Sequence, residues 1–312
     1  MDMGTEAKSL MKRRQKKSPA SSLPKSGNSN RILASNLRLL QLCAQLTERF
    51  DAEQISYLLL KGAAFVDTLY QDISTRSMTD IDLLVPLSEQ ERVDKIVKEE
   101  GFSFISPPEN RAGGWKHHYN WQYQSVDGAL IEIHFALSPK GMFKVDYIGL
   151  FRRKKEYSTP SRTVTTLSPE DTLLSLAIHE AKHAYSVPAH SSEDIKRLLE
   201  TWPPNWNAVI DRAASWGCKA ALFITLSRAQ RKGANVPNKA LKELAPSRAK
   251  LTALRAIFGP EGQAQPRLPT LPTWFKLVAA LSIADNNTQR RHFVSVYAKR
   301  RITDLAAMVR ST

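Results

Sequence analysis

The alternation of hydrophobic and polar positions changes character about halfway along the chain. Up to about residue 150, short apolar runs alternate with amphipathic segments whose apolar positions recur every three or four residues. The apolar runs predict strands over 55–62, 80–86, 115–124 and 129–137. The amphipathic segments predict helices over 32–50, 63–71 and 88–101. Asp127-Gly128, between the last two strands, is a strong hairpin signal.

Beyond about residue 165 the pattern is helical. Ser168 and Pro169 suit the N-cap and the first position of a helix. Further helices are expected over 191–201, 205–216, 218–231, 237–245, 249–258, 273–285 and 289–309. We therefore expect an α+β protein whose parts are a disordered basic tail (1–30), an α/β domain (31–160) and an all-helical domain (161–312).

Composition and charge indicate the location of the protein more than its function. The chain has 312 residues, of which 42% are hydrophobic, enough for a sizeable core. No apolar run approaches the length of a membrane span, and the two cysteines lie far apart, so we expect a cytoplasmic protein without a transmembrane segment. The net charge of +15 is concentrated toward both ends of the chain. We expect these basic residues to be solvated, and they mildly favour an anionic partner such as RNA.

The predicted strand 80–86 contains two carboxylates. Asp80 and Asp82 point to the same face, because side chains two apart along a strand share a face. Like charges held that close beside a core are costly unless a divalent cation lies between them. Glu132, inside the apolar strand 129–137, offers a third carboxylate and shares its face with His134. Three such oxygen ligands suit a site for one or two Mg²⁺ ions.

A glycine turn precedes the acidic strand. Gly62 lies where the first strand meets the following helix, a place where backbone N–H groups favour a phosphate. Lys61 precedes this glycine, and Arg76 lies four residues before Asp80. These residues are therefore candidates for contacts with phosphate groups.

The turn, Arg76, Asp80-x-Asp82 and Glu132-x-His134, in this order, resemble the nucleotidyltransferase superfamily with the polymerase-β-like fold. More narrowly, they resemble a bacterial family of largely uncharacterised nucleotidyltransferases over roughly residues 55–230. The resemblance implies a mixed sheet. It also implies that the three carboxylates of Asp80, Asp82 and Glu132 hold Mg²⁺ (or Mn²⁺), and that Lys61, Gly62 and Arg76 form the triphosphate site.

The activity that follows from this resemblance is transfer of a nucleoside monophosphate from an NTP, with ATP expected, and release of pyrophosphate. The acceptor is open: a small molecule, a peptide, a protein or a tRNA would fit. A toxin-type enzyme that modifies tRNA or protein is an alternative, as is an inactive member that only binds nucleotide or nucleic acid. We expect His134 and His118 to support the site, His118 only if its strand pairs with 129–137.

A second motif competes with this interpretation. His179-Glu180-x-x-His183 matches the H-E-x-x-H pattern of zinc peptidases, in which the glutamate is the base. No third zinc ligand is evident, since His190 is close but follows Pro188, and a zinc hydrolase would leave the acidic strands unexplained. We expect the two histidines to lie in the cleft between the domains.

Overall fold

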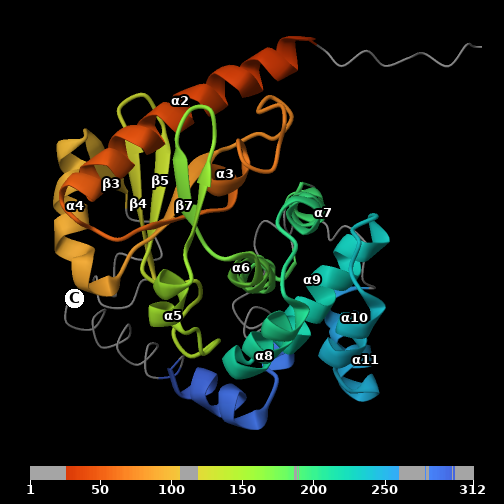
Figure 1. Cartoon of the computed structure of the whole chain (residues 1–312). Coiled ribbons are helices and arrows are strands. Elements are labelled where there is room, and N and C mark those ends of the chain that lie inside the picture. The colour runs from red at the N-terminus through yellow and green to blue at the C-terminus, as the bar shows by residue number, and fades with distance from the viewer. Residues whose placement is uncertain are drawn as a thin grey trace, which may run out of the picture.

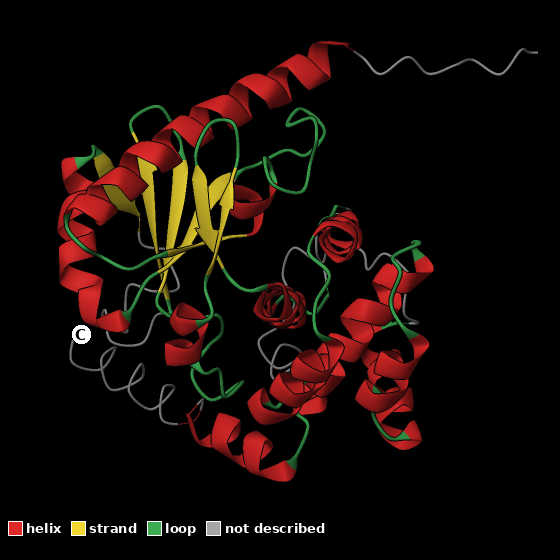
Figure 2. Cartoon of the chain, viewed as in Figure 1, coloured by secondary structure: helices red, strands yellow, loops and turns green. Residues whose placement is uncertain are grey.

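The computed structural model describes residues 26–105, 119–185, 188, 190–259, 278, 281–296 and 298. Most of the expected basic tail and much of the expected helices 273–285 and 289–309 lie outside these residues, as does His118. Along the described chain, the first half folds around one sheet and the second half is helical (Figures 1 and 2).

The sheet has seven strands in the order β3-β4-β5-β2-β1-β7-β6. Their bounds are β1 (Leu58–Leu60), β2 (Asp80–Leu84), β3 (Phe102–Ile105), β4 (Asn120–Ser125), β5 (Leu130–His134), β6 (Lys155–Ser158) and β7 (Thr163–Thr166). Strands β2 and β5 pair in parallel, as do β1 and β7, and the other neighbours are antiparallel. The sheet is therefore mixed, as predicted.

Helices α2 (Ser26–Ala52) and α4 (Gln90–Glu99) contribute to the core beside this sheet. Tyr123 on β4 is directly opposite Ile131 on β5, and its hydroxyl donates to Asp94 on α4 at 2.8 Å. The side of the sheet that carries Ile131 is therefore the side that α4 covers. Glu132 follows Ile131 and points to the other side, because side chains alternate along a strand. The alternation thus directs the acidic residues away from α4.

Two predicted turns have the expected local chemistry. Gly128 closes the β4–β5 hairpin with a φ of 88°, a conformation that glycine adopts without steric cost. Ser168 caps α6 (Pro169–Lys182) by accepting a hydrogen bond from Asp171 N at 3.2 Å.

The helical half follows the predicted boundaries closely. After α6 come α7 (Ser191–Thr201), α8 (Trp206–Trp216), α9 (Lys219–Arg231), α10 (Asn238–Leu244) and α11 (Arg248–Phe258). Figure 1 shows these helices gathered on one side of the sheet, with α6 nearest to it. The predicted α+β fold is confirmed. No helix among the described residues is long and apolar enough to span a membrane.

Some elements are absent from the predictions or shifted. The sheet continues past residue 160, where the helical domain was expected to begin, because the β6–β7 hairpin adds β7 beside β1. Short polar strands of this kind have no clear hydrophobic alternation. The described fold also contains the short elements β3, α3 (Lys61–Phe65), η1 (Leu87–Glu89) and α5 (Tyr147–Arg152), and residues 281–283 and 287–296 are helical. Because η1 precedes it, α4 begins at Gln90 rather than at the predicted residue 88.

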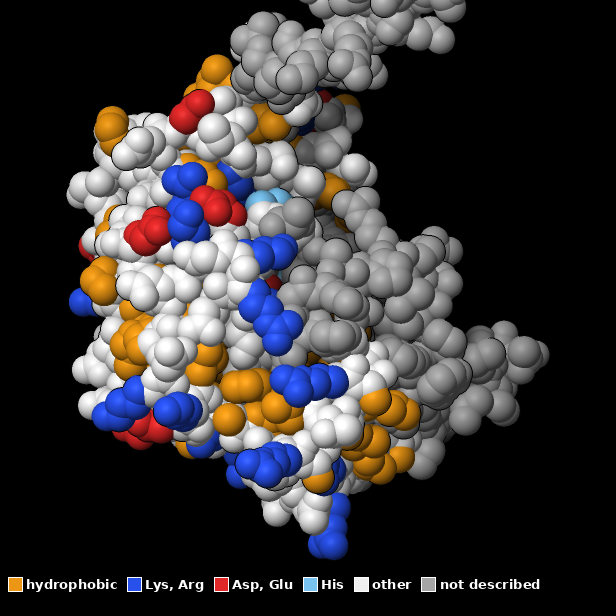
Figure 3. Space-filling view, turned by 90° about the vertical axis from the view of Figure 1, so that its right-hand side faces the viewer, with side chains coloured by type: hydrophobic (Ala, Val, Ile, Leu, Met, Phe, Trp, Pro, Cys, Tyr) orange, Lys and Arg blue, Asp and Glu red, His pale blue; other side chains and the backbone are white. Residues whose placement is uncertain are grey.

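The basic character of the sequence is visible on the surface. In Figure 3, Lys and Arg side chains are spread over the described part of the face shown, with fewer Asp and Glu side chains among them. Several of the carboxylates are instead buried, among them Asp82, Asp171 and Asp194.

Candidate functional site

The acidic site is built by the parallel pair β2 and β5. Their register places Asp82 directly opposite Glu132 and Leu84 directly opposite His134. His134 Nε2 lies 2.7 Å from Asp82 Oδ1 and 3.3 Å from Glu132 Oε2. Residues 50 positions apart in the chain therefore meet in one cluster, in which Asp82 and His134 are buried and Glu132 is partly exposed. We call it the acidic cluster: Asp82, Glu132 and His134.

Two amides on the neighbouring strand hold Glu132 in place. Asn120 Nδ2 donates to Glu132 Oε2 at 3.3 Å, and Gln122 donates to Glu132 Oε1. Gln122 is directly opposite Glu132 in the β4–β5 register. Neither residue was predicted from the sequence, although both occupy polar positions that alternate with aromatic residues in β4.

Burial opposes ionisation in the acidic cluster, but local partners outweigh it. Asp82 is 2% exposed, and the charges of Lys61 and His134 nevertheless hold its pKa well below the usual range. Burial likewise opposes ionisation of Glu132, but the hydrogen bond and charge of His134 lower its pKa to about 2. Both carboxylates are therefore ionised at neutral pH and are able to bind a cation.

Asp80 lies at the start of β2, beside this cluster. Its carboxylate accepts a hydrogen bond from the Thr79 hydroxyl at 3.0 Å. Burial and the nearby charge of Asp82 raise the pKa of Asp80 to about 6. The two aspartates of the strand thus differ in pKa, because Lys61 and His134 contact Asp82 and not Asp80. The predicted role of Asp80 as a metal ligand stays a prediction.

Lys61 reaches the acidic cluster from the end of β1. Its Nζ lies 2.8 Å from Asp82 Oδ1, and the Asp82 charge raises the lysine pKa in spite of burial. The Lys61 backbone has a φ of 46°, in the left-handed region that a side chain other than glycine rarely adopts. Such a backbone conformation costs free energy and is often found at functional sites.

Gly62 lies directly against the Arg76 guanidinium. A Cβ at this position would be 2.8 Å from Arg76 Nη1 and 3.2 Å from Met78 Cγ. The glycine is therefore required for the close approach of Arg76 to the turn, not for its backbone angles. The predicted contact of Gly62 with a phosphate stays a prediction.

Arg76 is occupied by a partner in the helical half. Its Nε and Nη2 each donate to a different Asp194 oxygen at 2.8 Å, and both side chains are at most 5% exposed. Asp194 Oδ1 also accepts from the Tyr70 hydroxyl at 2.6 Å. This buried, bidentate ion pair joins the segment before β2 to α7. The predicted contact of Arg76 with a triphosphate stays a prediction.

The donor atoms of the acidic cluster fit a divalent cation. One ligand atom from each of Asp82, Glu132 and His134 lies within 4.8 Å of the others, and among the described residues no other group of three such side chains is as compact. Two ionised carboxylates suit Mg²⁺ or Mn²⁺, whereas an imidazole nitrogen is more typical of zinc, copper, iron and nickel sites. The predicted set contained Asp80 rather than His134, which was expected only to support the ligands.

Comparison with known proteins identifies the family. The sequence profile of a family described as uncharacterised nucleotidyltransferases matches residues 7–232, well over half of the chain. The chain belongs to this family. Its members are named as enzymes of the nucleotidyltransferase type, which confirms the predicted resemblance.

Several solved structures are similar to this chain at low sequence identity. The lincomycin-bound lincosamide antibiotic adenylyltransferase LnuA shares 18% identity, with 51% of this chain and 94% of that chain covered and a TM-score of 0.36. The antibiotic-resistance factor ANT(2″)-Ia shares 16%, covering 57% and 91%, with a TM-score of 0.40. An antigenic nucleotidyltransferase-like protein from Paracoccidioides brasiliensis shares 16%, covering 69% and 96%, with a TM-score of 0.35. No curated protein matches the sequence.

In the alternative zinc motif, Glu180 would be the base, but its side chain points away from His179 and His183. Its carboxylate accepts from the Thr225 hydroxyl at 2.8 Å and from the Ser191 hydroxyl. Glu180 lies on α6, is 3% exposed and contacts α7 and α9 through these two hydroxyls. The rings of His179 and His183 are 4.6 Å apart on α6. With the glutamate used in helix packing, the motif lacks the geometry of a zinc hydrolase.

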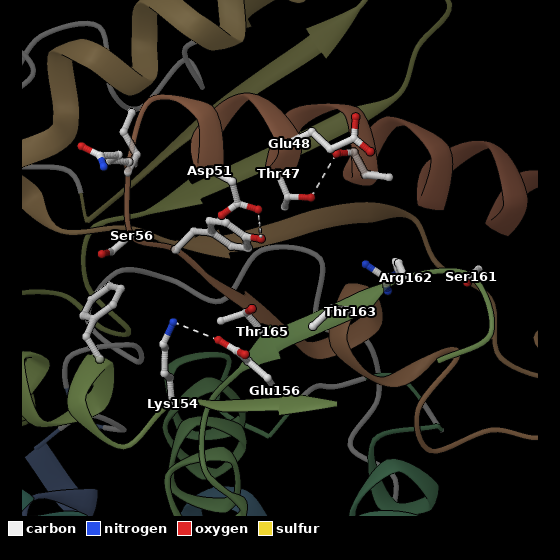
Figure 4. A pocket seen from close by; sticks show the side chains of 15 residues that line it. Thr47, Glu48, Asp51, Ser56, Lys154, Glu156, Ser161, Arg162, Thr163 and Thr165 are labelled. Atoms are coloured by element: carbon white, nitrogen blue, oxygen red, sulfur yellow. Dashed lines mark hydrogen bonds and ion pairs between the residues drawn. The ribbon is translucent and has the colours of Figure 1, made fainter. Parts of the chain in front are cut away.

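A separate hollow of about 600 Å³ lies between α2 and the β6–β7 hairpin (Figure 4). Hydroxyl and charged side chains line it, including Thr47, Asp51, Thr163 and Thr165. Its only basic side chains have acidic partners, Lys154 with Glu156 and Arg162 with Asp67. No residue of the acidic cluster lines this hollow, so it is distinct from the candidate site.

Proposed function

We propose that this nucleotidyltransferase moves a nucleoside monophosphate from an NTP, with ATP as the expected donor, to an acceptor and releases pyrophosphate. A divalent cation, Mg²⁺ or Mn²⁺, would be held by Asp80, Asp82 and Glu132, with His134 beside them. When bound, such a cation would neutralise charge on the transferred phosphoryl group. The acceptor is a small molecule, a peptide, a protein or a tRNA.

One observation carries this proposal: two carboxylates from adjacent strands, both ionised, share one buried imidazole. Lys61 and His134 keep these two carboxylates ionised side by side, and ionised carboxylate oxygens are the ligands that a divalent cation such as Mg²⁺ prefers. Membership of the family supplies the reaction type.

The surrounding residues have roles that follow from their contacts. His134 Nε2 lies between Asp82 and Glu132 and fixes the directions of both carboxylates. Lys61 contacts Asp82 and would move toward substrate phosphates once a cation takes its place on that carboxylate. With a pKa of about 2, Glu132 suits cation binding better than it suits accepting a proton from the acceptor.

Labelled substrates test the proposal directly. The protein is incubated with each α-³²P-labelled NTP, Mg²⁺ or Mn²⁺ and a cell extract, and the labelled product is identified. We expect label from at least one NTP to enter an acceptor. We expect Asp82→Asn and Glu132→Gln to reduce this transfer by about 100-fold or more, as loss of a charged ligand should.

A matched control separates the site from general charge effects. Asp211 is an exposed aspartate on α8, and Asp211→Asn should transfer label at the wild-type rate. Transfer at the wild-type rate by Asp82→Asn would contradict the proposed site. No transfer by the wild type with any NTP and either metal would contradict the proposed function.

A further inference from the structure

The last turn of α6 brings two side chains toward the acidic cluster from the helical half. His179 and Lys182 are three residues apart and so lie on one face of the helix. Lys182 Nζ lies 4.8 Å from the centre of the Tyr119 ring. The Tyr119 carbonyl accepts from Phe135 N at 2.7 Å, directly after the end of β5. Lys182 is therefore beside the end of the strand that carries Glu132 and His134.

Lys182 is a cation without a carboxylate partner among the described residues. It is half-buried, and burial together with the charge of Lys61 lowers its pKa to about 8. Glu132 and Asp82 act on this pKa in the opposite direction, which indicates that both lie near the ammonium group without forming an ion pair with it. A partly desolvated ammonium group in this position is costly unless an anion joins it.

His179 has an unsatisfied nitrogen in the same region. Its Nδ1 is buried and has no hydrogen-bond partner in the described structure. Burial and the charge of Lys61 hold the pKa of His179 well below its usual range, so the imidazole is neutral and able to donate from one nitrogen. Because buried polar groups are nearly always hydrogen-bonded, this nitrogen indicates a missing partner.

Of the two cations expected to bind phosphates, only Lys61 is proposed above to turn toward the substrate. Arg76 has Asp194 on two of its nitrogens, and Lys61 contacts Asp82. A polyphosphate beside the acidic cluster would need positive charge on its other side. Among the described residues, the last turn of α6 meets that need.

We propose that Lys182 and His179 form a polyphosphate subsite, with the Lys182 ammonium and the His179 Nδ1–H donating to phosphate oxygens of the NTP and of the pyrophosphate that is released. This inference rests on the proposed function, because it assigns the substrate phosphates to that same site. Bound phosphates would then contact residues from both the sheet and the helical half.

Calorimetry tests the role of Lys182 by measuring how tightly inorganic pyrophosphate binds to the full-length protein in the presence of Mg²⁺. We expect Lys182→Met to raise the Kd about tenfold or more, as loss of a charge-assisted hydrogen bond should, and Lys182→Arg to stay within about threefold of wild type. Lys95 on α4 has a 76% exposed side chain, and Lys95→Met is the matched control that should bind as wild type does. Melting temperatures without ligand check that each variant is folded, and Lys182→Met should not be destabilised.

A second pair of variants tests His179. Asn carries an amide nitrogen close to the position of Nδ1, whereas Phe keeps the ring shape and removes the donor. We therefore expect His179→Phe to weaken pyrophosphate binding and His179→Asn to retain most of it.

The outcomes separate this inference from the proposed function. Wild-type affinity for pyrophosphate in Lys182→Met would overturn the subsite, even if nucleotide transfer proceeds. Wild-type affinity in His179→Phe would remove His179 from it. If pyrophosphate binding depends on Lys182 while the wild type transfers no nucleotide, the subsite stands and the proposed function fails.

Discussion

Asp80 and Asp82 are two residues apart on one strand, yet their surroundings shift their pKa values in opposite directions. Burial and the charge of Asp82 raise the pKa of Asp80 to about 6, whereas Lys61 and His134 keep that of Asp82 low. In the metal-free protein, Asp80 therefore takes up a proton between about pH 4 and pH 6, a range in which the unfolded chain has already released it.

This difference predicts a pH-dependent effect of Asp80→Asn. Because the folded-state pKa is raised, the contribution of Asp80 to the free energy of unfolding falls as the pH rises through this window. We expect Asp80→Asn to have near wild-type stability at about pH 4 and to be more stable by up to about 3 kcal/mol at pH 7. Urea unfolding with a chelator present, at both pH values, measures this. An equal difference at both pH values would contradict it.

Gly62 allows a second residue-level prediction. A Cβ at this position would meet Arg76 Nη1 at 2.8 Å, and the guanidinium cannot move aside freely because Asp194 holds it. We expect Gly62→Ala to lower the free energy of unfolding by about 1–3 kcal/mol. Gly27 on α2 has no atom within 4 Å of such a Cβ, so Gly27→Ala should be neutral or slightly stabilising. Urea unfolding of both variants checks the contrast.

At the scale of elements, two partly or fully buried glutamates have different neighbours. Glu180 on α6 accepts hydrogen bonds from α7 and α9, whereas Glu132 on β5 belongs to the acidic cluster. We expect Glu180→Gln to cost about 1 kcal/mol of stability and little activity. Glu132→Gln should lose most of the activity and also some stability, because His134 and Gln122 stabilise the ionised carboxylate. Labelled-nucleotide transfer and urea unfolding of both variants decide this. A folded but inactive Glu180→Gln beside an active Glu132→Gln would reverse the assignment.

Most elements could be predicted because their signals are local. The helix starting at Ser168, the strand 80–84 and the Gly128 hairpin each depend on nearby residues. The partners of Arg76 and Glu180 could not be predicted in the same way. Asp194, 118 residues from Arg76, and Thr225, 45 residues from Glu180, are brought close only by tertiary packing. Glu132 was a candidate because it lies inside an apolar strand, but spacing alone could not show that this strand pairs with β2.

At the scale of the whole molecule, the Arg76–Asp194 ion pair joins the two halves. Breaking a buried pair leaves a charge without a partner, so Arg76→Met alone should destabilise the protein by about 3–5 kcal/mol. The double variant Arg76→Met with Asp194→Leu should recover most of this loss. Calorimetry of NTP binding to the folded double variant tests the predicted contact of Arg76 with a triphosphate. Weaker NTP binding than in the wild type would support that contact, and wild-type affinity would contradict it.

The position of β6 at the edge of the sheet has a consequence for solubility. An edge strand exposes unpaired backbone groups that can recruit strands of other molecules and start aggregation. β6 is short, and Lys155 and Glu156 are exposed on it, the latter paired with Lys154 at 3.0 Å. Fixed charges on so short an edge disfavour the addition of a foreign strand. The hairpin that lengthens the sheet beyond β1 therefore also ends it with a strand that is poorly suited to intermolecular pairing.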